Sequence, residues 1–391
     1  MTEAVIVAAA RTPIGRAHKG SLVDVDAFEL GKVAVQGAID RSSIPPADID
    51  DIVLAESLQG GGVIARYVAV DLGLTSIPGL ADNRHCAAGL SAVQIAAGSI
   101  KAGMDRVVVA GGTESLSSMV LGQKSVPASA GNPQTWMSPA NPPTPEAPPF
   151  DMALTVGENT ARIAGVTREQ ADEWAYHSHV RAAHARDEGL FDPEIVPVPV
   201  PDGNGGTTAF TRDEHPRANT TLEKLASLPV VHPELDRAVV TAGNAAGLND
   251  AAAALVVTAD DYAAANGLVP FARIVSWASI GIEPERTGLA PTIAIPKALD
   301  RAGLAIGDID LFEINEAFCT MAVASTRILG IDHDIVNVNG SGCGLGHPIA
   351  ATGARMVVSM LHELRRRDLT LGCVAMCAGG GMGSALVMEL L

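Results

Sequence analysis

Apolar runs of strand length alternate along this chain with longer small-residue stretches of helical length. The runs 4–10, 107–110 and 373–378 consist of Ala, Val, Ile, Met and Cys, and polar or glycine-containing positions bound them. Runs of this length and composition are typical of fully buried strands. The stretches 86–102 and 347–366 are rich in small residues and have the length of helices. The alternation predicts an α/β fold whose strands pair in parallel within layers.

The same order of elements occurs twice. The segment Ala47–Leu54 reads ADIDDIVL, and Gly307–Ile314, 260 positions later, reads GDIDLFEI. Cys86 and His347 lie 261 positions apart, and each opens a helical stretch that leads to a strand ending in glycines. This self-similarity indicates two copies of one α/β unit packed as a pseudo-dimer, with equivalent helix starts converging at the centre. Generic strand–helix turns are the alternative, but three signals agree in order and spacing.

The region between the copies, roughly residues 118–238, has a different character. Its stretch Ser138–Pro149 is too rich in proline to form a central strand or helix. A helix is predicted from Val166 to Asp187, and its start carries the capping-box pattern of Thr167 and Gln170. We interpret the region as an insertion that lies over the core and holds substrate. The long helix disfavours the alternative of a disordered linker.

Composition limits the classes of function. Of the 391 residues 47% are hydrophobic and only 3% aromatic, so the interior is expected to consist of small and aliphatic side chains. The net charge of −17 and the pI near 4.9 argue against nonspecific nucleic-acid binding. No run reaches the ~18 apolar residues of a membrane span, and no signal peptide is evident. Five cysteines, an odd and sparse set, fit reduced thiols in the cytoplasm.

Two reactive side chains stand at the paired helix starts. Cys86 precedes a helix whose positive dipole end favours the thiolate, and a nearby imidazole would favour it further. His347 precedes Pro348 at the second helix start, where the dipole disfavours imidazolium and leaves a neutral base. Taken alone, Cys86 fits an inert core residue and His347 a helix cap. Their pairing in the repeat favours a nucleophile and its base.

A second thiol and a polar pair complete the candidates. Cys377 ends a buried strand at the glycine run Gly379–Gly381, whose backbone N–H groups can stabilise an oxyanion. A thiol there can move protons during acyl transfer through a thioester. Asn315 and Glu316 directly follow the second repeat strand, a position that often faces a site, although a turn or cap is the plainer explanation.

Two other kinds of site are disfavoured. The glycine run lacks the downstream helix and acidic residue of a dinucleotide-binding loop, and the chain ends too soon after it. A zinc site from His85, Cys86, Cys373 and Cys377 contains no C-x-x-C pair. We therefore expect no metal.

Taken together, these segments closely resemble the thiolase family over essentially the whole chain, in order and spacing. The motifs that carry the resemblance are Ala9–Gly15, Gly111–Ser115, Thr241–Asp250, Asn315–Phe318, Asn337–Gly340, Gly346–Pro348 and Cys377–Gly381. The resemblance implies a five-layer αβαβα core of two repeated βαβαβαββ halves with an inserted loop domain. Residues 1–117 with 239–266 would form the N-terminal half, 118–238 the inserted domain, and 267–391 the C-terminal half.

The resemblance also implies roles for the candidates. Cys86 would be the acylated nucleophile, His347 its base, and Cys377 the acid/base that deprotonates the incoming acetyl-CoA or CoA thiol. One oxyanion hole would combine His347 with a water held by Asn315. The other would use the backbone N–H groups of Cys86 and Gly379.

The resemblance extends to the CoA path, with departures. Arg217 looks like a loop-domain arginine that contacts CoA, and Ala242, Ala246 and Phe318 resemble the wall along the pantetheine. Ala246 replaces a usual serine, as does Ala88 directly after the nucleophile region. Further departures are a missing asparagine in Gly61–Arg66, the unusual Cys343, and Met152 where short-chain members carry a histidine. These departures bear on acyl-chain preference.

The expected activity is that of an acetyl-CoA C-acyltransferase, which cleaves 3-ketoacyl-CoA with CoA or runs the reverse condensation. CoA thioesters would be its substrates, and no cofactor would be permanently bound. The missing pocket histidine favours degradation of longer or bulkier chains. Cys377 disfavours ketosynthases of related fold.

A homo-oligomer, dimer or tetramer, is expected. A thiolase-like partner subunit that binds acyl-CoA but has altered chemistry is the alternative, motivated by Ala88 and Ala246.

Overall fold

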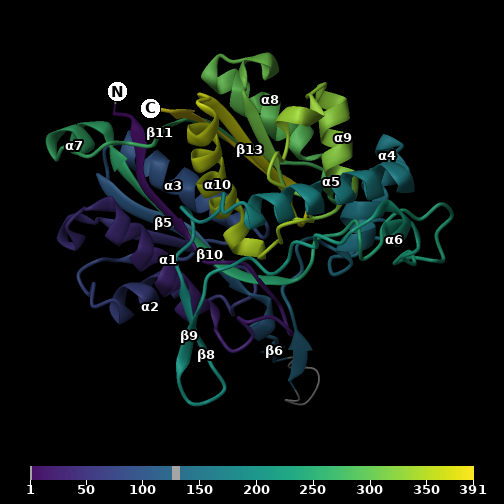
Figure 1. Ribbon diagram of the computed structural model, residues 1–391, viewed down its shortest axis with the longest axis horizontal. Coiled ribbons are helices and arrows are strands. Elements are labelled where there is room, and N and C mark those ends of the chain that lie inside the picture. Colours follow the sequence, from purple (N-terminus) through teal and green to yellow (C-terminus); the bar gives the residue numbers. More distant parts are fainter. Residues whose placement is uncertain (1, 126–132) are drawn as a thin grey trace.

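One mixed ten-stranded sheet runs through the computed structural model, which describes residues 2–125 and 133–391 (Figure 1). Its strand order is β12-β13-β14-β11-β1-β10-β5-β3-β4, and the short β2 pairs with β10 beside this path. Residues 126–132 of the expected insertion lie outside the described residues.

The elements alternate as the apolar pattern predicts. The strands of the large sheet are β1 (Ala4–Arg11), β2 (Gly15–Arg16), β3 (Asp51–Ala55), β4 (Gly79–Leu80), β5 (Val107–Ser115), β10 (Asn249–Ala259), β11 (Ala272–Gly281), β12 (Leu311–Ile314), β13 (Leu371–Ala378) and β14 (Met382–Leu390). The helices that cover it are α1 (Ala27–Ser42), α2 (Ile64–Asp71), α3 (Ala88–Lys101), α7 (Asp260–Ala265), α8 (Pro291–Ala302), α9 (Cys319–Leu329) and α10 (Thr352–Arg367).

The two halves repeat one order of elements, which confirms the predicted fold, but the expected parallel pairing holds only for β3–β4, β3–β5 and β12–β13, and the other pairs of the large sheet are antiparallel. In the N-terminal half this order is β1, α1, β3, α2, β4, α3, β5, β10, and the strands lie in the order β1-β10-β5-β3-β4. The C-terminal half runs β11, α8, β12, α9, α10, β13, β14, with the matching strand order β11-β14-β13-β12. The counterpart of β4 is reduced to one parallel bridge between Val336 and Phe312.

Helices separate the sheet halves into layers. α1 packs on β1, β5 and β10, α8 packs on β11, β13 and β14, and α3 packs against α10 between the halves. Figure 1 shows α3 and α10 side by side in the middle, with α8 and α1 towards opposite ends. This is the expected αβαβα arrangement. The halves join edge to edge where β1 pairs with β11 at Val5–Arg273 and Ile6–Ala272.

Small residues let the two central helices approach closely. A Cβ atom added at Gly89 of α3 would overlap the carbonyl oxygen of Ala350, and one added at Gly353 of α10 would overlap the backbone nitrogen of Leu90. The first turns of the two helices therefore meet backbone to backbone. The crossing lies next to Cys86 on one side and His347 on the other, so the sequence repeat correctly predicts that the two helix starts converge.

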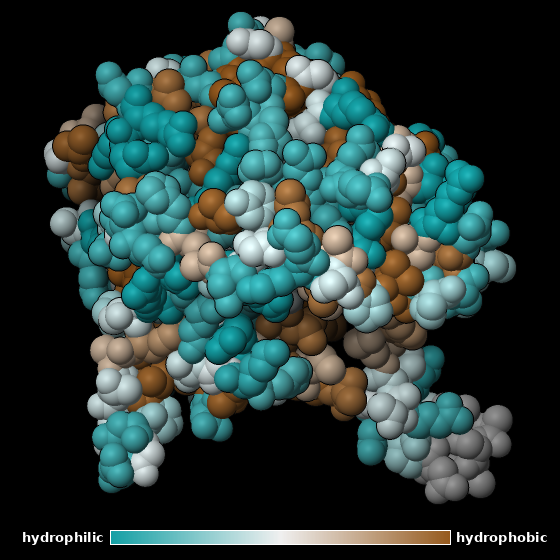
Figure 2. Space-filling model, turned by 45° about the vertical axis from the view of Figure 1, so that its right-hand side comes forward, coloured by the Kyte–Doolittle hydropathy of each residue, from teal (hydrophilic) through white to brown (hydrophobic). Residues whose placement is uncertain are grey.

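The insertion contains its own elements. They are the hairpin strands β6 (Gly122–Lys124) and β7 (Gln134–Trp136), the π-helical turn η4 (Ala153–Glu158), α4 (Asn159–Ala164), α5 (Arg168–Asp187), the hairpin strands β8 (Val198–Pro201) and β9 (Thr207–Phe210), and α6 (Leu222–Ala226). Thr167 and Gln170 form the predicted capping box at the start of α5. Figure 2 shows two projections below the main body, with apolar side chains between them.

A buried ion network ties the insertion to the core. Arg11 of β1 donates two hydrogen bonds to the Asp213 carboxylate, at 2.8 and 2.9 Å, and one to Glu194 at 2.6 Å. Ser359 of α10 donates to the same Glu194 oxygen at 3.0 Å. All four side chains are buried, so removal of one partner would leave an uncompensated charge or dipole. The insertion is thus fixed to β1 and α10.

Among the residues that the structure describes, no helix combines the length and the apolar character needed to cross a membrane.

Candidate active site

A strained turn presents Cys86 at the start of α3. Asn83 Oδ1 accepts a hydrogen bond from the backbone N–H of His85 at 2.8 Å, and His85 has a φ of 47°. This left-handed conformation is unfavourable for a residue with a side chain, so the surrounding structure must hold it. No side chain caps the helix at Ala87. The turn therefore brings Cys86 close to the free N–H groups of the first helical turn.

Cys86 is half-buried, and its surroundings favour the thiol over the thiolate. Burial raises the pKa of Cys86 to about 11, although hydrogen bonding to the backbone of Gly379 and to its own backbone lowers it. Desolvation of the charge thus acts against the thiolate that the helix start is expected to favour. A base must therefore remove the proton before Cys86 can act as a nucleophile.

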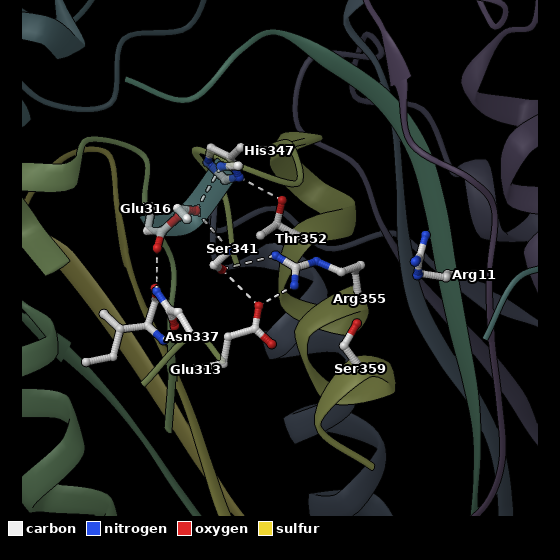
Figure 3. Close-up of polar contacts among 12 residues, drawn as sticks. Arg11, Glu313, Glu316, Asn337, Ser341, His347, Thr352, Arg355 and Ser359 are labelled. Atoms are coloured by element: carbon white, nitrogen blue, oxygen red, sulfur yellow. Dashed lines mark hydrogen bonds and ion pairs between the residues drawn. The ribbon is translucent and has the colours of Figure 1, made fainter. Parts of the chain in front are cut away.

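His347 is a neutral base. Burial, with a smaller contribution from the nearby Arg355 guanidinium, lowers the pKa of His347 to about 3. The neutral state agrees with the sequence-based expectation, but its main cause is desolvation and not the helix dipole. Figure 3 shows His347 above Thr352 and Arg355 of α10.

Hydrogen bonding fixes which ring nitrogen of His347 can accept a proton. The Thr352 hydroxyl donates its one hydrogen to the Pro348 carbonyl at 2.8 Å, so the His347 Nδ1–H donates to Thr352 Oγ1 at 2.7 Å. Asn315 Nδ2, a donor, lies 3.4 Å from His347 Nε2. Both contacts leave the lone pair on Nε2. This nitrogen is the one available to take a proton from a thiol.

Cys377 lies at the end of β13, buried against Met321, whose Sδ is 3.5 Å from the Cys377 Sγ. Burial raises the pKa of Cys377 above its usual range, and negative charge on Cys86 raises it further. The two thiols are therefore close enough to influence each other's ionisation. Two thiols that both resist ionisation can each hold a proton until a substrate carbonyl offers a place for negative charge.

The glycine run after Cys377 makes room for neighbouring segments. Gly380 and Gly381 have φ values of 86° and 77°, and a Cβ at Gly380 would lie 2.5 Å from the Ala140 carbonyl oxygen. The proline-rich stretch of the insertion therefore seats against this run. A Cβ at Gly379 would lie 3.7 Å from Met152 Sδ and 3.9 Å from His85 Cδ2. Met152 and His85 thus both lie next to the position that a side chain at Gly379 would occupy.

Asn315 and Glu316 take different directions. Asn315 is fully buried beside His347, and its Oδ1 has no hydrogen-bond partner among the described residues. Glu316 points away from His347 and accepts hydrogen bonds from Trp174, Ser178, Asn337 and the Cys343 backbone. Of the polar pair expected to face the site, only Asn315 does so. Glu316 anchors the turn that holds it.

An ion pair lies beneath His347. Arg355 of α10 is paired with Glu313 of β12, and the Ser341 hydroxyl donates to the same Glu313 oxygen at 2.8 Å (Figure 3). Burial raises the pKa of Glu313, and Arg355 opposes this effect. The pair joins the strand before Asn315 to the helix after His347, and so fixes their relative position.

The predicted CoA-path residues come partly together. The segment 244–246 pairs with 317–319, through an antiparallel bridge from Ala245 to Phe318 and a 3.0 Å hydrogen bond from the Ala246 N–H to the Ala317 carbonyl. Ala246 and Phe318 are therefore neighbours, and both are half-buried. Ala242 is exposed at the start of this segment, and Arg217 is exposed on the insertion.

Sequence reasoning missed the supporting residues Thr352, Arg355, Asn249 and His215. Thr352 and Arg355 lie on the helix that His347 precedes, and their spacing suggests one face only once that helix is placed. Asn249 falls in the motif Thr241–Asp250, and His215 lies two positions before Arg217. Among residues 2–125 and 133–391, no three His, Cys, Asp or Glu side chains form a group able to hold a metal ion.

Family models match nearly all of the chain. The model described as "Thiolase, N-terminal domain" matches residues 4–261, and that described as "Thiolase, C-terminal domain" matches residues 268–390.

Individual proteins are similar over their full length. The chain is 42% identical to an acetyl-CoA acetyltransferase of Escherichia coli strain K12 and 39% identical to a 3-ketoacyl-CoA thiolase of Bacillus subtilis strain 168, with both chains fully covered in each case. The crystal structure of the Bacillus anthracis acetyl-CoA acetyltransferase superposes with a TM-score of 0.92 at 39% identity, covering 100% of this chain and 99% of the other. Human mitochondrial 3-ketoacyl-CoA thiolase gives a TM-score of 0.88 at 32% identity with the same coverage.

Proposed function

The chain belongs to the thiolase family, and we propose that it transfers acyl groups through an acyl-enzyme on Cys86. It is an acyltransferase that acts on CoA thioesters. The observation that carries the proposal is the convergence at Cys86. The backbone of Gly379 lies close enough to the Cys86 thiol to lower its pKa, negative charge on Cys86 raises the pKa of Cys377, and the helix crossing brings the His347 segment alongside.

In the degradative direction the first step forms the acyl-enzyme. His347 Nε2 takes the Cys86 proton as the sulfur attacks the 3-keto carbon of the substrate. The bond between C2 and C3 then breaks, the shortened acyl group stays on Cys86, and the electron pair leaves with C2 as the enolate of acetyl-CoA. Cys377 donates its proton to C2 and becomes a thiolate, so acetyl-CoA departs neutral at that carbon.

The second step releases the acyl group. The Cys377 thiolate takes the proton of an incoming CoA thiol, and the CoA sulfur attacks the thioester carbonyl on Cys86. The carbon–sulfur bond to Cys86 breaks, and protonated His347 returns its proton to the leaving sulfur. Each group ends in its starting state, so the cycle needs no metal or redox cofactor.

Two groups of donors suit the two oxyanions. The N–H groups of Gly379 and Cys86, which lower the Cys86 pKa, are suited to bind the oxyanion of the tetrahedral intermediate formed at the acyl carbon. Asn315 Oδ1 is a buried acceptor without a partner among the described residues, which is the usual setting for an ordered water. We assign that water and His347 to the enolate oxygen.

We assign Arg217, Ala242, Ala246 and Phe318 to the CoA path. Arg217 is exposed, Ala246 and Phe318 lie in paired segments, and Ala242 lies beside these segments. Arginine is suited to the CoA phosphates because its donors match their geometry. We propose that residues 1–117 with 239–266 form the N-terminal half, 118–238 the inserted domain and 267–391 the C-terminal half. The missing histidine at Met152 favours longer or bulkier 3-ketoacyl chains in a degradative, fatty-acid-type reaction.

We further propose that the enzyme is a cytoplasmic homo-oligomer. β4 ends the strand order of the large sheet, and Leu80 on it is 43% exposed. The adjacent α2 exposes Tyr67, and Val63 directly before α2 is also exposed, each by 55%. An unpaired edge beside apolar side chains favours pairing with a second copy.

Trapping of the acyl-enzyme tests the main proposal. Incubation with acetyl-CoA is expected to add one acetyl group to Cys86, read by mass spectrometry of the peptide that contains it. Cys86→Ala should lose thiolysis by several orders of magnitude, because a covalent nucleophile has no substitute. Cys343→Ala is the matched control, since this buried thiol is outside the proposed chemistry. A label on Cys377, or an active enzyme without label, would refute the assignment.

A further inference from the structure

His215 lies where three segments of the chain meet. It is buried in the run Asp213–Arg217 of the insertion. Its Nε2 lies 3.0 Å from the Cys343 carbonyl oxygen, and its Nδ1 lies 3.3 Å from Asn249 Nδ2. A carbonyl accepts and an amide NH₂ donates, so His215 carries its proton on Nε2 and accepts at Nδ1. One neutral ring thus forms hydrogen bonds with both the loop before His347 and the start of β10.

Asn249 carries the connection to His347. Its Oδ1 accepts the backbone N–H of His347 at 3.0 Å, while its Nδ2 donates to the Gly15 carbonyl at 2.9 Å and faces His215. All of these groups are buried, so each hydrogen bond left unmade would cost the desolvation of its partner. The amide of Asn249 therefore has one orientation, which the His347 N–H, the Gly15 carbonyl and His215 Nδ1 fix together.

The residues beside His215 are fixed independently. Asp213 holds Arg11 and accepts the Ile14 N–H at 2.8 Å, and Glu214 accepts the N–H groups of Arg16 and Ser21 at 3.2 and 2.9 Å. Three consecutive side chains thus anchor this part of the insertion to the core. Arg217, the candidate CoA contact, follows two positions after His215.

Packing leaves the His215 ring no freedom. A Cβ added at Gly247 would overlap its Cε1, and on another side the ring stacks on His179, with centroids 6.0 Å apart and planes at 23°. Burial lowers the pKa of His215 to about 4, and Arg217 contributes in the same direction. The ring is held in place as a neutral hydrogen-bonding link.

We propose that His215 is a positioning residue for the transfer reaction: it orients Asn249, which fixes the backbone of His347, and it joins this base to the segment that carries Arg217. The inference rests on the proposed role of His347. One side chain would then both orient His347 and fix its position relative to the segment that carries Arg217.

Two isosteric variants separate the two hydrogen bonds. The amide oxygen of Asn can replace the acceptor Nδ1, and the amide nitrogen of Gln can replace the donor Nε2. His215→Asn keeps the bond from Asn249 and is expected to keep kcat within a few-fold. His215→Gln leaves Asn249 Nδ2 unpaired and is expected to lower kcat by about 10²-fold, the typical cost of misplacing a reacting group by an ångström. KM for acetoacetyl-CoA should change less than kcat.

A third variant moves the ring without altering its chemistry. Gly247→Ala would place a methyl group against the His215 ring and displace it from its present hydrogen bonds, which should lower kcat in the same way as His215→Gln. Tyr262→Phe is the control, because Tyr262 hydrogen-bonds Asp48 at 2.7 Å and shares no hydrogen bond with His215, Asn249 or His347; it should lower the melting temperature and leave kcat unchanged.

The outcomes are distinct. An undiminished kcat in His215→Gln, or equal kcat losses in His215→Asn and His215→Gln that follow their losses of melting temperature, would overturn the positioning role. If the histidine variants do not fold, normal kcat in Gly247→Ala would overturn it. Acetylation of Cys86 in the unaltered enzyme, and its slowing in His347→Ala, test the underlying function separately. Failure there would reject the role of His347 whatever the His215 variants show.

Discussion

At the residue scale, the site keeps its reactive groups uncharged until substrate arrives. The pKa of Cys86 is raised to about 11 and that of His347 is lowered to about 3, both chiefly by burial. A thiol and an imidazole shifted in this way do not exchange a proton at rest. The oxyanion donors lower the energy of charge only once it has moved onto substrate oxygen, which is where it speeds the reaction.

Substitution of Cys377 separates the two proton transfers. Cys377→Ala is expected to accept an acetyl group on Cys86 from acetyl-CoA, because a CoA thiolate can leave without a positioned acid. It should lose the exchange of acetyl-CoA C2 protons with D₂O, and thiolysis should fall by about 10²–10⁴-fold, the usual contribution of a general acid or base. The measurements are peptide mass spectrometry, deuterium incorporation and steady-state thiolysis.

Cys373→Ala provides the matched control. Cys373 lies on the same strand, β13, and is also fully buried, but it belongs to the core of the C-terminal half. Its loss should cost stability and leave C2 exchange intact. Full turnover by Cys377→Ala would remove Cys377 from the mechanism.

At the scale of the elements, the crossing of α3 and α10 determines the active-site geometry. Each helix contributes one glycine at which the other helix's backbone takes the place of a side chain. The proposed nucleophile Cys86 and base His347 lie at equivalent positions in the two halves, so their separation depends on how closely these helices pack. Two helices can approach until their backbones are in contact only where the residues at the crossing are the smallest ones.

Gly89→Ala tests this dependence. The added methyl would overlap the Ala350 carbonyl oxygen and is expected to destabilise the fold by about 1–3 kcal/mol, as overpacking does. Thiolysis should fall as well, because Ala350 follows His347 closely. Gly98→Ala on the same helix is the control, since its Cβ would lie 3.8 Å from the Trp277 ring, an ordinary contact. It should be neutral or stabilising by up to about 1 kcal/mol. Equal effects in chemical denaturation would show that the crossing is not tightly packed.

At the scale of the whole molecule, buried carboxyl groups make stability depend on pH. Asp82, four positions before Cys86, has its pKa raised to about 7 by burial, with Arg84 opposing the shift. Its Oδ1 has no hydrogen-bond partner in the described part of the chain. In the unfolded chain this group has a pKa near ~3.9. Between these two pH values the folded state therefore binds the Asp82 proton more tightly than the unfolded chain does. The stability that this proton contributes is lost as pH rises through about 7.

Asp82→Asn removes this titration. The melting temperature of the variant minus that of the unaltered protein should increase between pH 5 and pH 8, because only the latter must ionise a buried carboxyl. The buried histidines titrate equally in both proteins and cancel in the difference. Asp24→Asn, at an exposed position, should give a constant difference in the same thermal scans. A constant difference for Asp82→Asn too would mean that Asp82 ionises freely in the folded protein.

The sequence predicted those features that depend on local pattern or on the repeat. Buried strands such as 107–110, the capping box at Thr167, and the convergence of the Cys86 and His347 helices all follow from residue order. The reduction of the β4 counterpart to a bridge at Val336 does not, because so short a pairing has no periodicity.

Features that depend on tertiary neighbours escaped prediction. The raised pKa of Cys86 results from burial by segments distant in sequence, and the helix dipole alone suggested the opposite direction. The inward turn of Glu316 depends on donors from Trp174 and Ser178 of the insertion. His215 stood in a segment singled out for Arg217, but nothing local indicates that its ring reaches Asn249.

The backbone contact between the central helices has a consequence for motion. Halves joined by a continuous sheet, and locked where Gly89 and Gly353 meet the opposite chain, have no hinge between them. Rocking of one half against the other would have to break this contact, so the spacing of Cys86 and His347 is expected to stay constant. Any movement that admits substrate is therefore expected in the insertion, whose hairpins β6–β7 and β8–β9 lie outside the large sheet.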